Sequence, residues 1–196
     1  MNTAAPRFVT NMNEPRSGAK WILESERLAF RRYTLDDLPQ LVEQRSDPEV
    51  NKFLGGPERQ NEIWLAKRIR FYISCYKSHG FGMCSMIWKD TGEIIGSAGL
   101  QPLEDTGEIE VGYSLIKKFW GRGLGTEAAR CWLDFGFRQA GLDRIVAVAD
   151  VDNLASRHIM EKLGMSYQKT EIHYGNECAF YEISREVFLN EVKYAN

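Results

Sequence analysis

The feature that most constrains this chain is a glycine-spaced turn between a strand-like segment and a helix-like segment. Residues 113–120 lead into Gly121, Gly123 and Gly125, and a helical pattern follows directly. Alternating glycines let the backbone turn tightly with its N–H groups facing inward, and the first turn of a helix adds unpaired donors and partial positive charge. Such a turn predicts an anion site that a pyrophosphate would fit.

Two familiar phosphate-binding loops do not match this spacing. No lysine precedes Thr126, as a P-loop requires. The third glycine of a dinucleotide-binding fingerprint would also fall on Thr126. The turn therefore predicts a phosphate site of another kind.

The composition is typical of one compact domain with a sizeable core. The chain has 196 residues, 43% of them hydrophobic and 12% aromatic, with a formal net charge of −2. This charge does not indicate direct nucleic-acid binding, and four scattered cysteines with three histidines indicate neither a disulfide framework nor a metal site. Because we find no signal-peptide-like or membrane-spanning apolar run, we expect a cytoplasmic protein without a membrane partner. The sequence leaves the oligomeric state open, with a homodimer among the options.

Hydrophobic periodicity predicts a mixed α/β chain with a flexible N-terminal arm over residues 1–22 and one domain over residues 23–196. The expected order is strand, two helices, three strands, helix, strand, helix and two strands. Chain breaks are expected at Pro48 and at residues 55–57, and Gly112 suggests a β-bulge. The predicted strands span 27–32, 81–88, 94–100, 108–115, 144–149, 167–170 and 179–183, and the predicted helices follow Thr34, span 61–78, follow Gly125 and span 155–163.

Two motifs flank the strand predicted at 144–149. One is Trp-Gly-Arg-Gly-Leu-Gly-Thr-Glu-Ala over residues 120–128, and the other runs from Asn153 through Ser156 to Glu-Lys-Leu-Gly-Met over residues 161–165. With the element order, these motifs resemble the GNAT superfamily of acetyl-CoA-dependent N-acyltransferases. Ser-Glu-Arg-Leu over residues 25–28, Arg31 and Glu-Val-Gly-Tyr over residues 110–113 resemble its Rim-type ribosomal-protein N-terminal acetyltransferases. The resemblance implies a mostly antiparallel sheet, splayed around a coenzyme cleft, with helices on both faces.

The resemblance also implies where acetyl-CoA binds. Backbone N–H groups of residues 122–126 would hold its pyrophosphate, the Arg122 guanidinium would reinforce them, and Trp120 would flank the coenzyme. Lys117 could instead be a solvated cation, and Asn153 could cap a helix as well as meet the pantetheine arm. The expected coenzyme-binding residues are Leu115, Lys117, Trp120, Gly121, Arg122, Gly123, Leu124, Gly125, Thr126, Asn153 and Ser156.

Glu110 and Ser156 are the predicted catalytic residues. Glu110 would act as a base through water, with Glu108 as the alternative and an exposed strand edge as the simpler interpretation of both. Many relatives of this superfamily place a tyrosine where this chain has Met160. Ser156 is therefore expected to protonate or solvate the leaving thiolate.

The predicted reaction is direct attack of a neutral primary amine on the thioester of acetyl-CoA in one ternary complex. An α-amino group has a pKa of about 8 and a lysine amine one of about 10.4, so a protein or peptide N-terminus is the favoured acceptor. Two alternatives stay open: a small amine acceptor, such as a polyamine, antibiotic or metabolite, or a non-catalytic acyl-CoA-binding module. Tyr167 and His173 are reserve catalytic candidates.

Overall fold

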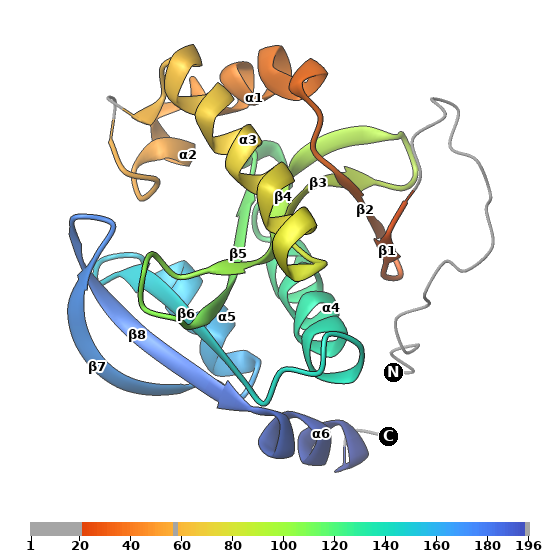
Figure 1. Cartoon of the computed structure of the whole chain (residues 1–196), viewed down its shortest axis with the longest axis vertical. Helices are drawn as coiled ribbons and strands as arrows, with labels where there is room; N and C mark the ends of the chain where they lie inside the picture. The colour runs from red at the N-terminus through yellow and green to blue at the C-terminus, as the bar shows by residue number, and fades with distance from the viewer. Residues whose placement is uncertain (1–20, 57–58, 195–196) are drawn as a thin grey trace.

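The computed structural model describes residues 21–56 and 59–194, with side chains to residue 190, so residues 1–20 of the expected arm lie outside the described residues. One sheet of eight strands runs in the order β1-β2-β3-β4-β5-β6-β8-β7 (Figure 1). Its neighbours are antiparallel except β5 and β6, which are parallel. The strands are β1 Leu23–Glu24, β2 Leu28–Arg32, β3 Met83–Trp88, β4 Glu93–Pro102, β5 Ile109–Leu115, β6 Arg144–Asp150, β7 Ser166–His173 and β8 Asn176–Ser184.

Helices cover both faces of this sheet. In Figure 1, α3 crosses in front of the central strands, α1 and α2 lie near its start, and α4 lies behind the sheet. The helices are α1 Leu38–Arg45, α2 Pro48–Asn51, α3 Glu62–His79, α4 Leu124–Arg138, α5 Leu154–Lys162 and α6 Arg185–Tyr194, with 3-10 turns η1 Leu35–Asp37 and η3 Lys117–Phe119. The mixed α/β class and the mostly antiparallel sheet are confirmed.

Two hydrophobic layers hold the sheet between its helices. On one face, Leu65 and Ile69 of α3 pack with Met83 of β3. On the other face, Trp132 of α4 is fully buried and meets Phe30 edge-on, with ring centroids 5.6 Å apart. The apolar stripes predicted for these two helices therefore face opposite sides of the same sheet.

The sheet splits between β5 and β6. β4 and β5 pair along the whole of β5, from Ile109 to Leu115. By contrast, within the described strands β5 and β6 are in register only where Glu110 lies opposite Val146. The edge of β5 after Glu110 therefore faces a cleft instead of a neighbouring strand, which agrees with the splayed sheet that we expected.

The predicted order of elements is confirmed, and the structure adds three elements. β1 has only two residues, and α6 follows β8 with no glycine or proline to mark its start. Pro48, expected to break the chain, occupies the first turn of α2, and Asp47 caps it by accepting the N–H of Glu49 at 2.9 Å. Proline is well suited to a first helical turn because its missing N–H would be unpaired there.

Two local predictions were wrong. Gly112 lies opposite Gly99 in uninterrupted register, and the shift in this part of the sheet occurs between Met86 and Ile87. The last two strands are also longer than predicted and approach each other to His173 opposite Asn176. Charged residues in these strands, such as Glu171, broke the apolar alternation that was used to set their ends.

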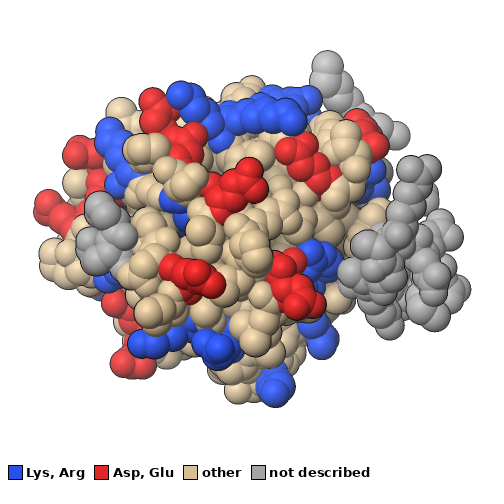
Figure 2. Space-filling view, turned by 90° about the horizontal axis from the view of Figure 1, so that it is seen from above, with Lys and Arg blue, Asp and Glu red and all other residues tan. Residues whose placement is uncertain are grey.

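The surface mixes charges of both signs. On the face shown in Figure 2, which views the molecule from the top of Figure 1, acidic and basic side chains are interspersed, in keeping with the formal net charge of −2. Within the described ranges, no helix has the length and hydropathy that crossing a membrane requires.

Candidate active site

The glycine turn ends in an uncapped helix start. Gly121 and Gly123 have φ values of 70° and 74°, a left-handed conformation that glycine adopts without steric cost. Gly123 is the N-cap of α4, and no side chain in the described part of the chain caps it. The first backbone hydrogen bond of the helix runs from the Glu127 N–H to the Gly123 carbonyl at 3.0 Å. The N–H groups of residues 124–126 therefore present the open donors that bind an anion.

Leu124 and Gly125 contribute to this turn through their backbone. The Leu124 side chain is buried in the core beneath α4. A Cβ on Gly125 would come within 2.9 Å of Ile159 Cδ1, so this glycine lets α4 pack closely against α5. The third glycine is thus explained by helix packing, whereas the first two shape the turn.

Four hydrogen bonds hold the turn against the segment between β1 and β2. The Glu127 carboxylate accepts from Ser25 Oγ at 2.7 Å, from the Arg27 N–H at 2.8 Å and from Arg27 Nε at 2.7 Å. Arg27 Nη1 also donates to the Arg122 carbonyl at 3.1 Å. Residues 25–27 therefore position the start of α4. In the sequence analysis this segment had served only as evidence of the family resemblance.

Three side chains that were expected to contact the coenzyme, those of Arg122, Trp120 and Lys117, contact other residues of this chain. The Arg122 guanidinium lies 5.1 Å from the ring centroids of both Trp88 and Phe119. Trp120 Nε1 donates to the Leu115 carbonyl at 2.8 Å.

Lys117 Nζ is 2.5 Å from Glu49 Oε2, and the hydrogen bond to Glu49 raises the pKa of this exposed lysine. Its side chain is therefore paired with α2 across the surface.

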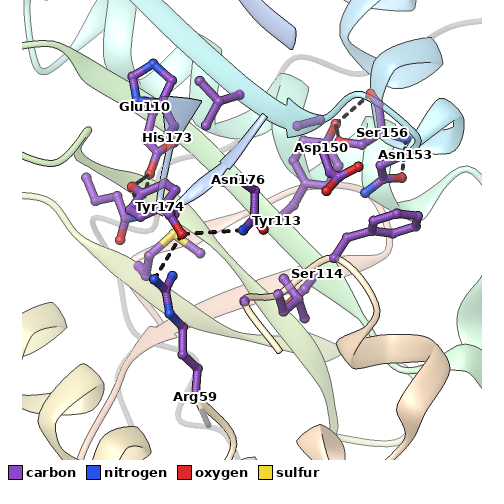
Figure 3. A pocket seen from close by; sticks show the side chains of 18 of the residues that line it. Arg59, Glu110, Tyr113, Ser114, Asp150, Asn153, Ser156, His173, Tyr174 and Asn176 are labelled. Atoms are coloured by element: carbon purple, nitrogen blue, oxygen red, sulfur yellow. Dashed lines mark hydrogen bonds between the residues drawn. The ribbon is translucent and has the colours of Figure 1, made fainter. Parts of the chain in front are cut away.

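A cavity of about 210 Å³ lies where the sheet splits. Side chains from α1 and α3, from β4 to β6, from α5 and from the turn between β7 and β8 line it. It brings together Glu110, Asn153 and Ser156 of the predicted site, whereas residues 120–126 do not line it. In Figure 3, Glu110 and Tyr174 lie on one side of the cavity, and Asn153 and Ser156 lie on the other.

Glu110 is the buried carboxylate of this cavity. Its side chain accepts from Gln101 Nε2 at 2.6 Å and from the Tyr174 hydroxyl, and only 5% of the residue is exposed. Burial raises the pKa of Glu110, although both hydrogen bonds and the charge of Arg68 act in the opposite direction. A carboxylate with a raised pKa, adjoining a cavity, is suited to accept a proton.

Two other candidates lie away from the cavity. Glu108 precedes β5, and its carboxylate forms an ion pair with Arg144 near the surface. Tyr167 is half exposed, and its hydroxyl lies 2.9 Å from Thr170 Oγ1. The geometry therefore favours Glu110 over both.

His173 lines the cavity and anchors the β7–β8 turn. Its ring nitrogens lie 2.9 Å from Glu104 Oε2 and 2.8 Å from Glu171 Oε1. Burial lowers the pKa of His173, but the hydrogen bonds to both carboxylates outweigh this effect and leave the pKa raised. The next residue, Tyr174, has a φ of 53°, and its carbonyl accepts from Arg59 Nη2 at 2.9 Å. These contacts set the position of the tyrosine that meets Glu110.

Ser156 faces the cavity from the first turn of α5. Asn153 Oδ1 accepts the Ser156 N–H at 3.1 Å, so Asn153 has the capping role that was one of its two expected functions. The Ser156 hydroxyl is 3.1 Å from the Tyr113 hydroxyl, and burial raises the pKa of Tyr113 to about 12. Met160, where many relatives have a tyrosine, is buried. The Tyr113 phenol, which comes from β5, therefore lies beside Ser156.

Sequence reasoning did not assign Tyr113, Gln101 or Tyr174 to the site. Tyr113 lies in the same motif as Glu110 but was not singled out as a site residue. Gln101 lies opposite Glu110 on the neighbouring strand β4, and Tyr174 approaches from 64 residues away. The described residues contain no group of three or more His, Cys, Asp or Glu side chains that could hold a metal.

Comparison with known proteins gives a consistent result. The family model "Acetyltransferase (GNAT) domain" matches residues 27–166. YkkB of Bacillus subtilis is 34% identical over 143 residues, which cover 70% of this chain and 80% of that protein. The N-acetyltransferase p20 of Bacillus licheniformis, itself uncharacterized, is 31% identical over 148 residues, which cover 75% and 82%.

A solved structure shows the same fold. RimL, the ribosomal L7/L12 alpha-N-protein acetyltransferase in complex with coenzyme A, superposes with a TM-score of 0.69 at 18% identity, covering 82% of this chain and 95% of that one. The family match, the relative p20 and the split sheet agree. This chain belongs to the GNAT family and is an acetyltransferase that uses acetyl-CoA.

Proposed function

We propose that this enzyme transfers the acetyl group of acetyl-CoA to the α-amino group of a protein or peptide, by direct attack in a ternary complex. The observation that supports this most is Glu110, a buried carboxylate with a raised pKa on the cavity wall across from Ser156. An amine between the two would have a proton acceptor on one side and a thioester on the other.

The residues present fit the coenzyme. The uncapped N–H groups of residues 124–126 would hold its pyrophosphate, with the Arg27 guanidinium close to Gly123. The open edge of β5 after Glu110 offers backbone groups to the amides of the pantetheine arm, as an added strand would use them. The Leu115 carbonyl already accepts from Trp120 Nε1, and its second lone pair could accept from the arm. Acetyl-CoA supplies the activated acetyl group, and the chain supplies its placement.

Glu110 would take a proton from the amine through a water molecule. The pKa of Glu110 is raised, and it therefore lies closer to that of an α-amino group than the usual carboxyl value does. An α-amino group has a pKa of about 7.7–8.0, whereas that of a lysine amine is about 10.4, so the proton transfer is less uphill for the N-terminal amine. This difference is the physical reason for favouring an N-terminal amine. The RimL structure is named for an acceptor of the same kind, and that name applies to RimL.

Ser156 and Tyr113 would stabilise the leaving thiolate. Their hydroxyl groups are 3.1 Å apart, and with its pKa raised to about 12 the Tyr113 phenol stays protonated at neutral pH. Either hydroxyl can donate a hydrogen bond to a sulfur anion. Backbone N–H groups on the open edge of β5 would stabilise the charge that develops on the acetyl oxygen.

Thiol release from acetyl-CoA tests this function. The panel contains peptides with a free N-terminus, the same peptides with a blocked N-terminus and one lysine, and the polyamine spermidine. We expect release only with the free N-terminus. Release with spermidine alone would instead support a small-amine enzyme. Calorimetric binding of acetyl-CoA, without release for any amine, would support a non-catalytic acyl-CoA module.

A further inference from the structure

One wall of the cavity carries a guanidinium group without a counter-ion. Arg45, the last residue of α1, lines the cavity and is only partly exposed. Among the residues that the structure describes, it makes no hydrogen bond and no ion pair. The groups that act on its charge are the phenols of Tyr33 and Tyr72 and the guanidinium of Arg68. Burial lowers the pKa of Arg45, and the like charge of Arg68 adds to this effect.

Arg68 does not relieve this imbalance. Its Nε donates to the Tyr72 hydroxyl at 3.1 Å, and its Nη2 donates to Gln101 Oε1 at 3.3 Å. Gln101 in turn donates to Glu110 at 2.6 Å, so Arg68 is linked to the carboxylate through an amide. The charge of Glu110 therefore balances Arg68 at most, and Arg45 is left over.

The other charged side chains of the cavity each have a hydrogen-bond partner. Arg59 donates to the Tyr174 carbonyl at 2.9 Å. Asp150, at the end of β6, accepts the Asp152 N–H at 3.0 Å. His173 lies between Glu104 and Glu171. Among the described cations of the cavity, Arg45 is thus the one whose N–H donors are all left for an anion.

A partly buried cation without a partner is costly, and proteins seldom keep one that has no use. We propose that Arg45, with Arg68 beside it, binds a carboxylate carried by the amine acceptor, so that the enzyme prefers a peptide with an acidic residue next to its N-terminal residue. This proposal rests on the proposed function, because it places the acceptor in the same cavity as Glu110. It also predicts that polyamines are poor acceptors, since two guanidinium groups would repel them.

Matched peptides test the preference. The three peptides have an N-terminal alanine and an amidated C-terminus, and they differ only at the second residue, which is Asp, Asn or Lys. We expect the wild-type kcat/KM for the Asp peptide to exceed that for the Asn peptide by about tenfold, as a charge-assisted hydrogen bond would give. In Arg45→Gln this ratio should fall to about one, and Arg45→Lys should restore part of it. Arg70→Gln, an exposed arginine on α3, is the matched control and should leave the ratio unchanged.

A small amino acid carries the same carboxylate, so β-alanine and its amide form a second pair. A preference within the peptide pair alone identifies an acidic side chain as the group bound. A preference within the β-alanine pair alone overturns the peptide part of the proposal. Equal turnover of all neutral and acidic acceptors overturns the anion site and leaves the transferase standing.

Two further measurements keep the test independent of turnover and of folding. Calorimetry should show tighter binding of the Asp peptide than of the Asn peptide to the wild type, even if no acceptor releases thiol. The melting temperature of Arg45→Gln without ligand should equal or exceed that of the wild type, because the substitution removes an unpaired charge. A clear drop would instead show that Arg45 has a structural role, which contradicts the proposal.

Discussion

The glycine turn and the wall around Glu110 lie at the two ends of one proposed reaction path, and they are built in opposite ways. The turn is a contiguous stretch, residues 121–127, that presents backbone N–H groups at an exposed helix start. The wall joins Arg68, Gln101, Glu110 and Tyr174, which come from three strand or helix segments and one turn. A local backbone site can be recognised from sequence, whereas a network of buried side chains exists only once the chain has folded.

The two regions also differ in what a substitution should change. Donors at the turn are near solvent, so their loss should mainly weaken coenzyme binding. Glu110 is buried, where each hydrogen bond and charge acts through little water and shifts its pKa. We therefore expect changes at the turn to raise the KM for acetyl-CoA, and changes at the wall to alter kcat and its pH dependence.

The largest effect is expected for Glu110→Gln. Loss of the proposed base should lower kcat/KM for a peptide acceptor by about 10² to 10³-fold, with little change in the KM for acetyl-CoA. Steady-state thiol release measures both quantities. Glu108→Gln, which alters a surface ion pair on the same segment, is the matched control. Equal losses in the two variants would contradict the assignment.

The thermal stability of Glu110→Gln gives a second test of the same assignment. Because burial raises the folded pKa of Glu110 above its unfolded value, the folded state binds this proton more tightly. Its contribution to stability is therefore greatest at low pH and is lost as the pH rises through the raised value. At pH 7 the Gln variant should melt at an equal or higher temperature than the wild type, as thermal unfolding will show.

At the turn, Gly123→Val should raise the KM for acetyl-CoA by about tenfold or more, because a branched residue resists φ of 74° and would distort the start of α4. Gly92→Val is the control. Gly92 has the same φ of 74°, and, like Gly123, no atom lies within 3.4 Å of the Cβ that it would gain. Both variants should lose similar stability, and only the first should lose coenzyme affinity in calorimetry. An unchanged KM for Gly123→Val would remove the turn from the coenzyme site.

Ser156→Ala should lower kcat by about tenfold, an effect smaller than that of the base, because the Tyr113 hydroxyl remains 3.1 Å from the position that Ser156 Oγ held. Tyr113→Phe should cost less, and the double variant should lose more than the two single losses combined. Ser74→Ala, a helical serine on the exposed face of α3, is the control. Full kcat in Ser156→Ala would assign the thiolate to solvent or to another group.

How far the sequence predicts this molecule follows from the same contrast. The order of elements and the start of α4 could be derived because apolar periodicity and glycine spacing are local properties. Glu110 and Ser156 were predicted as site residues through motifs that resemble a known family, and their catalytic roles stay predictions. Tyr174 was not, since its contact with Glu110 depends on a β7–β8 turn that approaches from 64 residues away.

The details that the sequence analysis missed have the same origin. Gly112 suggested a bulge, but a glycine also fits a regular strand, and pairing with β4 keeps it in register. Nothing in the sequence indicated that the Arg122 guanidinium would lie over the Trp88 ring, and its expected contact with phosphate stays a prediction. Tertiary neighbours decided each of these positions, and no pattern within a short window encodes them.

The smallest change is expected for Tyr174→Phe, and its sign is the sharpest test of the wall. The Tyr174 hydroxyl donates to Glu110 and so lowers the pKa of that carboxyl, against the effect of burial. Without the donor the pKa of Glu110 should rise further, so the acidic limb of kcat/KM should move to higher pH. On the alkaline side of this limb activity should stay within about threefold, because the substitution removes one hydrogen-bond donor and leaves the carboxyl group in place. Tyr167→Phe, at an exposed tyrosine away from the cavity, should leave the profile in place. A limb that moves to lower pH would mean that Tyr174 acts on another group, and that the buried carboxylate is not what titrates.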